Sequence, residues 1–154
     1  MKKGYWIFLT LFFVMVVGVF FLATGKLESM LIYLDIASLV LVPGFALLLS
    51  LAFFSPKEIG NAFRYAKESA PFDKSEIEKG IVFFTTLQTL IIFSAIFGVI
   101  TGAVAILQNI SDMTIVGKNM GIALIVLLYA AFFICFLTLP FTGALKKRLA
   151  ANMK

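Results

Sequence analysis

Small and polar residues recur along one apolar stretch of the chain and are the first candidates for a functional surface. Ser94, Gly98, Thr101, Ala105 and Gln108 are separated by four, three, four and three positions. This spacing places them on one face of an α-helix. Gly98 and Gly102 also form a GxxxG pattern, which permits close approach of helix backbones. The stripe therefore indicates either a tight helix contact or the lining of a shared pore.

Groups that carry chemistry are missing from the apolar stretches. Asp35, at the edge of one of them, is the acid that comes closest, and we interpret it as a helix cap. The chain has no histidine and one cysteine, Cys135. No nucleophile–base pair or phosphate-binding glycine loop is present. We therefore expect no enzyme, no metal site and no cofactor.

The elements that position these residues follow from the composition, which is 62% hydrophobic and 14% charged. Four apolar runs are long enough to cross a hydrocarbon layer of about 30 Å: they cover residues 5–23, 36–54, 80–107 and 120–140. The first is too long for a signal-peptide core of about 7–15 residues, so we expect a retained span. The sequence predicts a single domain, residues 1–154, of all-α membrane class with four transmembrane helices.

Basic residues set the expected orientation, because lysine and arginine in short loops stay on the cytoplasmic side. Only Lys26 and Lys118, of 13 basic residues, fall on the other side of the four spans. We therefore expect a multi-pass protein of the inner membrane with both termini in the cytoplasm. The net charge of +5 reflects topology and contact with anionic lipid, and no basic groove indicates nucleic acid.

The cytoplasmic connection, residues 55–79, carries two helix-start signals of the Ser-x-x-Glu type, at Ser55 and at Ser75. The first predicts an amphipathic helix from Pro56 to about residue 69, lying at the membrane surface. The second predicts the start of the third span. We expect short outer connections at residues 24–35 and 108–119, a kink at Pro43 and a basic tail over residues 141–154.

Several short motifs, in this order of elements, resemble the MotA/TolQ/ExbB proton-channel family and its MotA branch in particular. In the second half they are Phe97–Gly102, Gly117, Met120–Leu124, Leu128–Tyr129, Leu139–Pro140 and the basic tail; in the first half they are Asp35–Gly44, Ser55–Glu58 and Ala62–Phe63. The resemblance covers nearly the whole chain, as a short form without the large cytoplasmic domain.

The resemblance implies a homo-oligomeric ring, typically of five subunits, around the transmembrane helices of a MotB/TolR/ExbD-like partner. That partner supplies the ion-carrying aspartate, and ion flux moves it against the ring. The pore- or partner-facing residues would be Ser94, Gly98, Thr101, Gly102, Ala105, Ala123, Tyr129 and Pro140. The third and fourth spans would face the axis, with the first two spans, which are rich in bulky apolar residues, outside.

The chain departs from the family pattern at three places. Val126 and Leu127 replace a usual threonine pair, and Ala95–Ile96 replaces a usual proline. The cytoplasmic domain is reduced to residues 55–79. We therefore keep two main hypotheses: a ring-forming, ion-coupled stator-type subunit, and a non-conducting structural or accessory subunit of a larger complex. A lone small-solute transporter is disfavoured because there is no buried charge or internal repeat.

Overall fold

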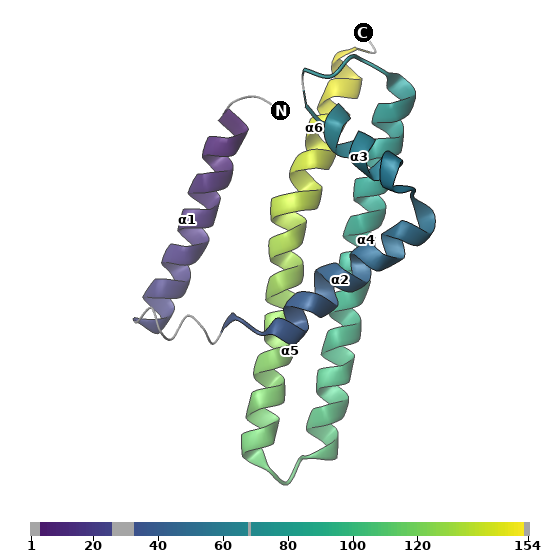
Figure 1. The fold of residues 1–154 in the computed structure, drawn as a ribbon. Coiled ribbons are helices and arrows are strands. Elements are labelled where there is room, and N and C mark those ends of the chain that lie inside the picture. Colours follow the sequence, from purple (N-terminus) through teal and green to yellow (C-terminus); the bar gives the residue numbers. More distant parts are fainter. Residues whose placement is uncertain (1–3, 26–32, 68, 153–154) are drawn as a thin grey trace.

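The computed structural model describes residues 4–25, 33–67 and 69–152, and within these ranges every regular element is helical (Figure 1). In chain order they are α1 (Gly4–Thr24), α2 (Ile36–Phe53), α3 (Pro56–Tyr65), α4 (Lys74–Gln108), α5 (Met113–Phe133), the π-helical turn η2 (Ile134–Thr138) and α6 (Leu139–Ala151). Three described segments are long and apolar enough to cross a membrane: Ile36–Phe53, Lys74–Gln108 and the continuous run Met113–Ala151. An all-helical fold with membrane-length helices is confirmed, whereas the fourth span stays a prediction.

An antiparallel pair of long helices, α4 and α5, forms the centre of the molecule (Figure 1). The pair is closely packed where glycines of α4 meet α5. A Cβ atom added at Gly98 would lie 2.8 Å from Cγ1 of Val126, and one added at Gly102 would lie 3.1 Å from Cβ of Ala123. Only glycine allows this approach, so both glycines are used for packing within the chain.

The second long helix is longer than the sequence indicates. Asp112 caps it, because its carboxylate accepts hydrogen bonds from the backbone N–H groups of Thr114 (2.9 Å) and Ile115 (3.3 Å). Helix α5 therefore begins at Met113, and most of the predicted outer connection, residues 108–119, is helical. At the other end α6 continues to Ala151, so most of the expected tail is helical as well.

A π-helical turn joins α5 to α6 just before Pro140. The N–H of Leu139 bonds the carbonyl of Ile134, five residues earlier, and the hydroxyl of Thr138 donates to the same carbonyl at 3.1 Å. Proline has no N–H to donate, so the widened turn lies where the regular bond pattern is already interrupted. The helix passes through the proline without ending.

Helix α2 crosses α4 and α5 obliquely on one side (Figure 1). Its contact face is a row of small and branched residues spaced by four, all at most 2% exposed: Ser38, Val42, Ala46 and Ser50. Asp35 caps the helix, as expected, by accepting hydrogen bonds from the backbone N–H (2.8 Å) and hydroxyl of Ser38. The helix continues through Pro43.

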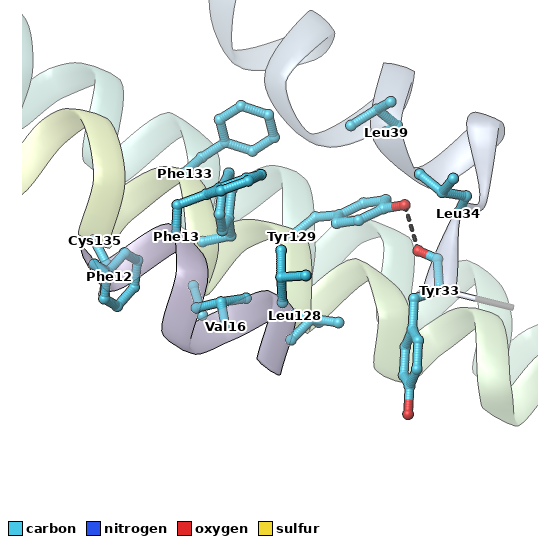
Figure 2. A pocket seen from close by; sticks show the side chains of 13 residues that line it. Phe12, Phe13, Val16, Tyr33, Leu34, Leu39, Leu128, Tyr129, Phe133 and Cys135 are labelled. Atoms are coloured by element: carbon cyan, nitrogen blue, oxygen red, sulfur yellow. Dashed lines mark hydrogen bonds between the residues drawn. The ribbon is translucent and has the colours of Figure 1, made fainter. Parts of the chain in front are cut away.

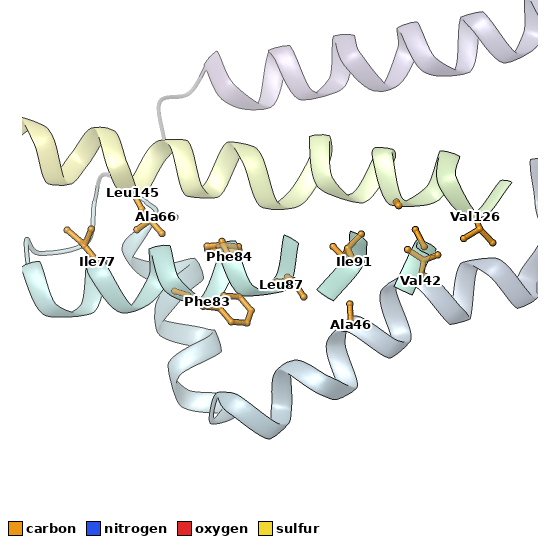
Figure 3. Close-up of a cluster of buried hydrophobic side chains, with 13 residues drawn as sticks. Val42, Ala46, Ala66, Ile77, Phe83, Phe84, Leu87, Ile91, Val126 and Leu145 are labelled. Carbon is orange, nitrogen blue, oxygen red and sulfur yellow. The ribbon is translucent and has the colours of Figure 1, made fainter. Parts of the chain in front are cut away.

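The expected amphipathic helix is present as α3, and its apolar face lies against the rest of the protein. Ala62 and Ala66 are each 2% exposed, and the Phe63 ring meets the rings of Phe84 and Phe141 at centroid distances of 5.1 Å. Figure 3 shows this end of the buried cluster, which α3, α4 and α6 share. The position of α3 at the cytoplasmic surface stays a prediction.

The start of α4 also differs from the prediction. Its N-cap is Asp73, whose carboxylate accepts from the backbone N–H of Glu76 at 3.2 Å, and Ser75 lies inside the first turn. The first predicted signal is confirmed: Ser55 and Glu58 form a reciprocal capping box at the start of α3. A carboxylate two residues earlier thus replaced the second serine as the cap.

Candidate functional site

The predicted polar stripe of α4 is divided between the interior and the surface of the chain. Ser94 is fully buried and its hydroxyl donates to the carbonyl of Leu90 at 2.8 Å, while Gly98 is buried against α2 and α5. Thr101 is exposed and donates to the carbonyl of Gly98 at 2.8 Å. Ala105 is half-buried and Gln108 is exposed. Only the half of the stripe nearest the α4–α5 turn therefore offers polar groups to another molecule.

The candidates on α5 and α6 are also partly covered by the chain itself. Ala123 is half-buried against Gly102, and Pro140 is half-buried after the π-helical turn. Two residues beyond Pro140, the hydroxyl oxygen of Thr142 is buried without a hydrogen-bond partner. Sequence reasoning missed Thr142, because burial at this position depends on how α6 packs against α4.

Tyr129 fixes the start of α2 to the last part of α5. Its hydroxyl donates to the carbonyl of Tyr33 at 2.6 Å and accepts from the backbone N–H of Asp35 at 3.1 Å (Figure 2). Tyr129, predicted as pore-facing, is thus half-buried and joins two helices of the same chain. This contact sets the depth of Asp35 relative to the long hairpin.

The α4–α5 hairpin extends well beyond this contact. Met113, the first residue of α5, lies 16 positions before Tyr129, which is about 24 Å along a helix. Figure 1 shows the turn of the hairpin far from the start of α2. We call the part formed by residues 101–124 the hairpin end. Helix α2 does not reach it.

The hairpin end exposes large apolar side chains. Their exposed fractions lie between 48% and 77%, at Val104, Leu107, Ile110, Met113, Met120 and Leu124. Gly117 and Gly121 lie on the same segment with nothing within 4 Å of an added Cβ atom. A GxxxG pair without a partner in the chain leaves space for close approach by another helix.

The opposite end of the bundle is charged. Lys79 forms an ion pair with Glu76 at 3.0 Å, and the amide of Asn61 in α3 donates to the other carboxylate oxygen of Glu76 at 2.7 Å. Lys146 and Lys147 lie at the same end, because Leu145 contacts Gly80. We call this the basic end. Among the described residues, no cluster of three or more potential ligands suggests a metal site.

No protein-family model matches the chain, and no curated protein matches it. The site combines two features: a hairpin end that exposes large apolar side chains and two glycines beside the charged Asp112 and Lys118, and a helix α4 that holds no acidic or basic side chain between Gly80 and Gln108.

Proposed function

We propose that the chain is a ring-forming, MotA-like subunit of the inner membrane. In this proposal several copies place their α4–α5 hairpins around the transmembrane helices of a partner that carries an ion-binding aspartate. The ring would contain five copies, the number that the family resemblance implies. The observation that carries the proposal is the apolar hairpin end, which the chain itself does not cover.

The position of the bilayer follows from the charged residues. A hydrocarbon layer of about 30 Å covers about 20 helical residues. If the layer starts at Gly80, next to the charges of the basic end, then its other boundary lies near Ile100 of α4. Tyr129 and the start of α2 lie close to that level, because Gly98 faces Val126. This placement keeps the Asp35 carboxylate near the boundary, where its charge is hydrated.

In this placement the hairpin end lies outside the hydrocarbon layer, which shortens the third span expected at residues 80–107 and shifts the fourth, expected at residues 120–140, toward residues 126–145. An apolar side chain that is fully exposed to water forfeits roughly 1.5–3 kcal/mol relative to its buried state. Exposed patches of this kind mark protein contacts. Adjacent copies of the same hairpin offer a matching surface, since a helix can pack closely against Gly117 and Gly121. The basic end would face the cytoplasm, with α1 as a fourth span and both termini inside.

The partner supplies the group that this chain lacks. Ion transfer through a membrane needs an ionisable or coordinating group along the path. Residues 81–108 and 119–145 contain no acidic or basic side chain. Thr101 of α4 carries an exposed hydroxyl next to Ile100, where the layer ends in this placement. We therefore propose that the chain forms the housing for the ion path and that the partner carries the ion.

A proton-flux assay tests this proposal. Liposomes that contain the full chain alone should collapse a pH gradient no faster than empty liposomes. Co-reconstitution with a single-span partner that bears a membrane aspartate should produce flux, which replacing that aspartate by asparagine should abolish. Thr101→Val should reduce the flux, while Thr89→Val, an exposed hydroxyl elsewhere on α4, should not. Flux from the chain alone would contradict the proposal.

The second candidate is a non-conducting structural subunit. Val126 favours it, because this side chain occupies one of the two positions where the resembling family usually has threonine and is buried against Gly98. No hydroxyl is available there. Such a subunit would still form rings with its hairpin ends in contact, but the flux assay would give no signal with any partner.

A further inference from the structure

A cleft separates α1 from α5 and from the start of α2 (Figure 2). Its volume is about 540 Å³, and Phe12, Phe13 and Val16 of α1 line one side. Leu128 and Ala131 of α5 lie on the other side. The lining is almost wholly apolar, and the hydroxyl of Tyr129 at its end is already bonded to backbone groups of the chain. Water would find few partners there.

The size of the cleft limits what fills it. Along α5 it runs from Leu128 to Cys135, which is about 10 Å. A length of about 10 Å accommodates about two turns of a helix or part of an acyl chain. The lining is apolar and comes from three separate segments, so a flexible hydrocarbon chain adapts to the cleft more readily than a helix with a rigid backbone.

The negative charge of Asp35 at the end of the cleft favours an occupant with a positively charged group. Asp35 follows Tyr33 and Leu34, which both line the cleft, and its carboxylate is only partly buried. One carboxylate oxygen accepts hydrogen bonds from Ser38. No basic residue occurs between positions 33 and 56 or between positions 119 and 145. A cationic group is therefore complementary to this end of the cleft.

We propose that the cleft binds one acyl chain of a phospholipid whose primary ammonium head group lies against Asp35. The lipid would fill the space between α1 and the rest of the bundle and hold α1 in place. Asp35 lies near the expected boundary of the hydrocarbon layer, which is the depth of a head group. This inference does not depend on ring formation or on ion transport.

Native mass spectrometry of the full chain in mild detergent tests the proposal. The probes are phosphatidylethanolamine and phosphatidylglycerol with identical acyl chains. We expect one retained phosphatidylethanolamine per chain, with a preference of about three-fold over phosphatidylglycerol, the size of a partly exposed ion pair. Asp35→Asn should remove the preference but keep lipid binding, because asparagine is also a good helix cap.

Variants that fill the cleft separate this site from general lipid contact. Ala131→Trp should lower retention of both lipids, whereas Leu48→Trp, on the exposed face of α2, should not. If Ala131→Trp fails to fold, alkylation of Cys135 with N-ethylmaleimide gives a second readout in the native chain: added phosphatidylethanolamine should slow it. Equal retention of the two lipids by the native chain, or unchanged retention in Ala131→Trp, would overturn the proposal. The proposal would also be overturned if Ala131→Trp changed the oligomeric state of the chain without loss of bound lipid.

Discussion

Arg148 ties the end of α6 to the connection between α3 and α4. Its guanidinium donates to the carbonyls of Tyr65 at 2.7 Å and Lys67 at 2.9 Å, and also to that of Ala70. The guanidinium thus satisfies carbonyl groups just after α3, where a cation is also favoured by the helix dipole. A single side chain holds together three segments of the basic end.

Arg148→Ala should therefore destabilise the protein. The variant leaves partly buried carbonyls without their charged donor, and we expect a loss of about 1–3 kcal/mol in the free energy of unfolding. Unfolding in mixed detergent micelles, followed by circular dichroism, measures it. Lys147→Ala is the matched control, since that neighbouring side chain is exposed. Equal stability of the two variants would show that the three hydrogen bonds contribute nothing.

At the scale of the helices, Gly98 of α4 allows close contact with both α2 and α5. An added methyl group there would lie 2.8 Å from Val126 and 3.0 Å from Leu41, so α2 or α5 would have to move. Gly98→Ala should lower the free energy of unfolding by roughly 1–3 kcal/mol through overpacking, less the gain in helix propensity of about 1 kcal/mol. Thermal unfolding in detergent measures the difference.

The control for this prediction is Gly60→Ala in α3, where an added Cβ atom meets nothing within 4 Å. That variant should be slightly more stable than the native chain, because alanine is the better helix former. If Gly98→Ala were stabilising to the same degree, the close packing between α4 and α5 would be disproved.

The capping box of α3 should make that helix sensitive to acid. Glu58 accepts hydrogen bonds from the backbone N–H and the hydroxyl of Ser55, each at 2.8 Å, and these bonds lower its pKa below the ordinary value of 4.5. A lowered folded-state pKa gives stability that is present above pH 4.5 and is lost as the pH falls through the folded-state pKa.

We therefore expect the unfolding temperature to fall more steeply as the pH drops from about 5, just above the ordinary pKa of 4.5, to about 3 in the native chain than in Glu58→Gln. Glutamine keeps a similar shape but does not titrate. Calorimetric scans at fixed ionic strength compare the two proteins. Parallel pH profiles would mean that the capping box contributes no acid sensitivity.

The helices could be predicted from the sequence because apolar runs and caps are local signals. Ser55 and Asp35 were identified as helix starts, and the structure confirms both. The start of α5 was missed because residues 108–119 contain polar residues and a glycine, although Asp112 before Met113 is a usable cap signal. The second serine signal was wrong because Asp73 precedes it and caps the same helix.

The candidate site was less predictable, because helix periodicity does not show which face meets which neighbour. The sequence placed Ser94, Gly98 and Thr101 on one face, but the first two pack inside the chain and the third is exposed. The burial of Thr142 depends on how α6 packs against α4, and the extent of the hairpin end depends on how far α2 reaches along α4 and α5. Such information comes from tertiary packing alone.

At the scale of the whole molecule, the chain has two unlike ends. The basic end is closed by aromatic packing among α2, α3, α4 and α6, with Phe54 and Phe83 at a centroid distance of 5.3 Å. The hairpin end is a bare pair of helices with apolar side chains exposed on several sides. The chain thus covers its large apolar side chains at the basic end and leaves them exposed at the hairpin end. We therefore propose that copies of the chain contact one another through this end and form a ring.

Cysteine cross-linking in native membranes tests this claim most directly. In a Cys135→Ser background, Met120→Cys places a thiol on the hairpin end, and Leu48→Cys places one on the exposed face of α2 as a control. With a bifunctional maleimide, Met120→Cys should give a cross-linked dimer, the largest product that one thiol per chain allows, while Leu48→Cys stays monomeric. A Met120→Cys chain that stays monomeric and reacts rapidly with a membrane-impermeant maleimide would show a bare, water-exposed hairpin end and contradict the ring.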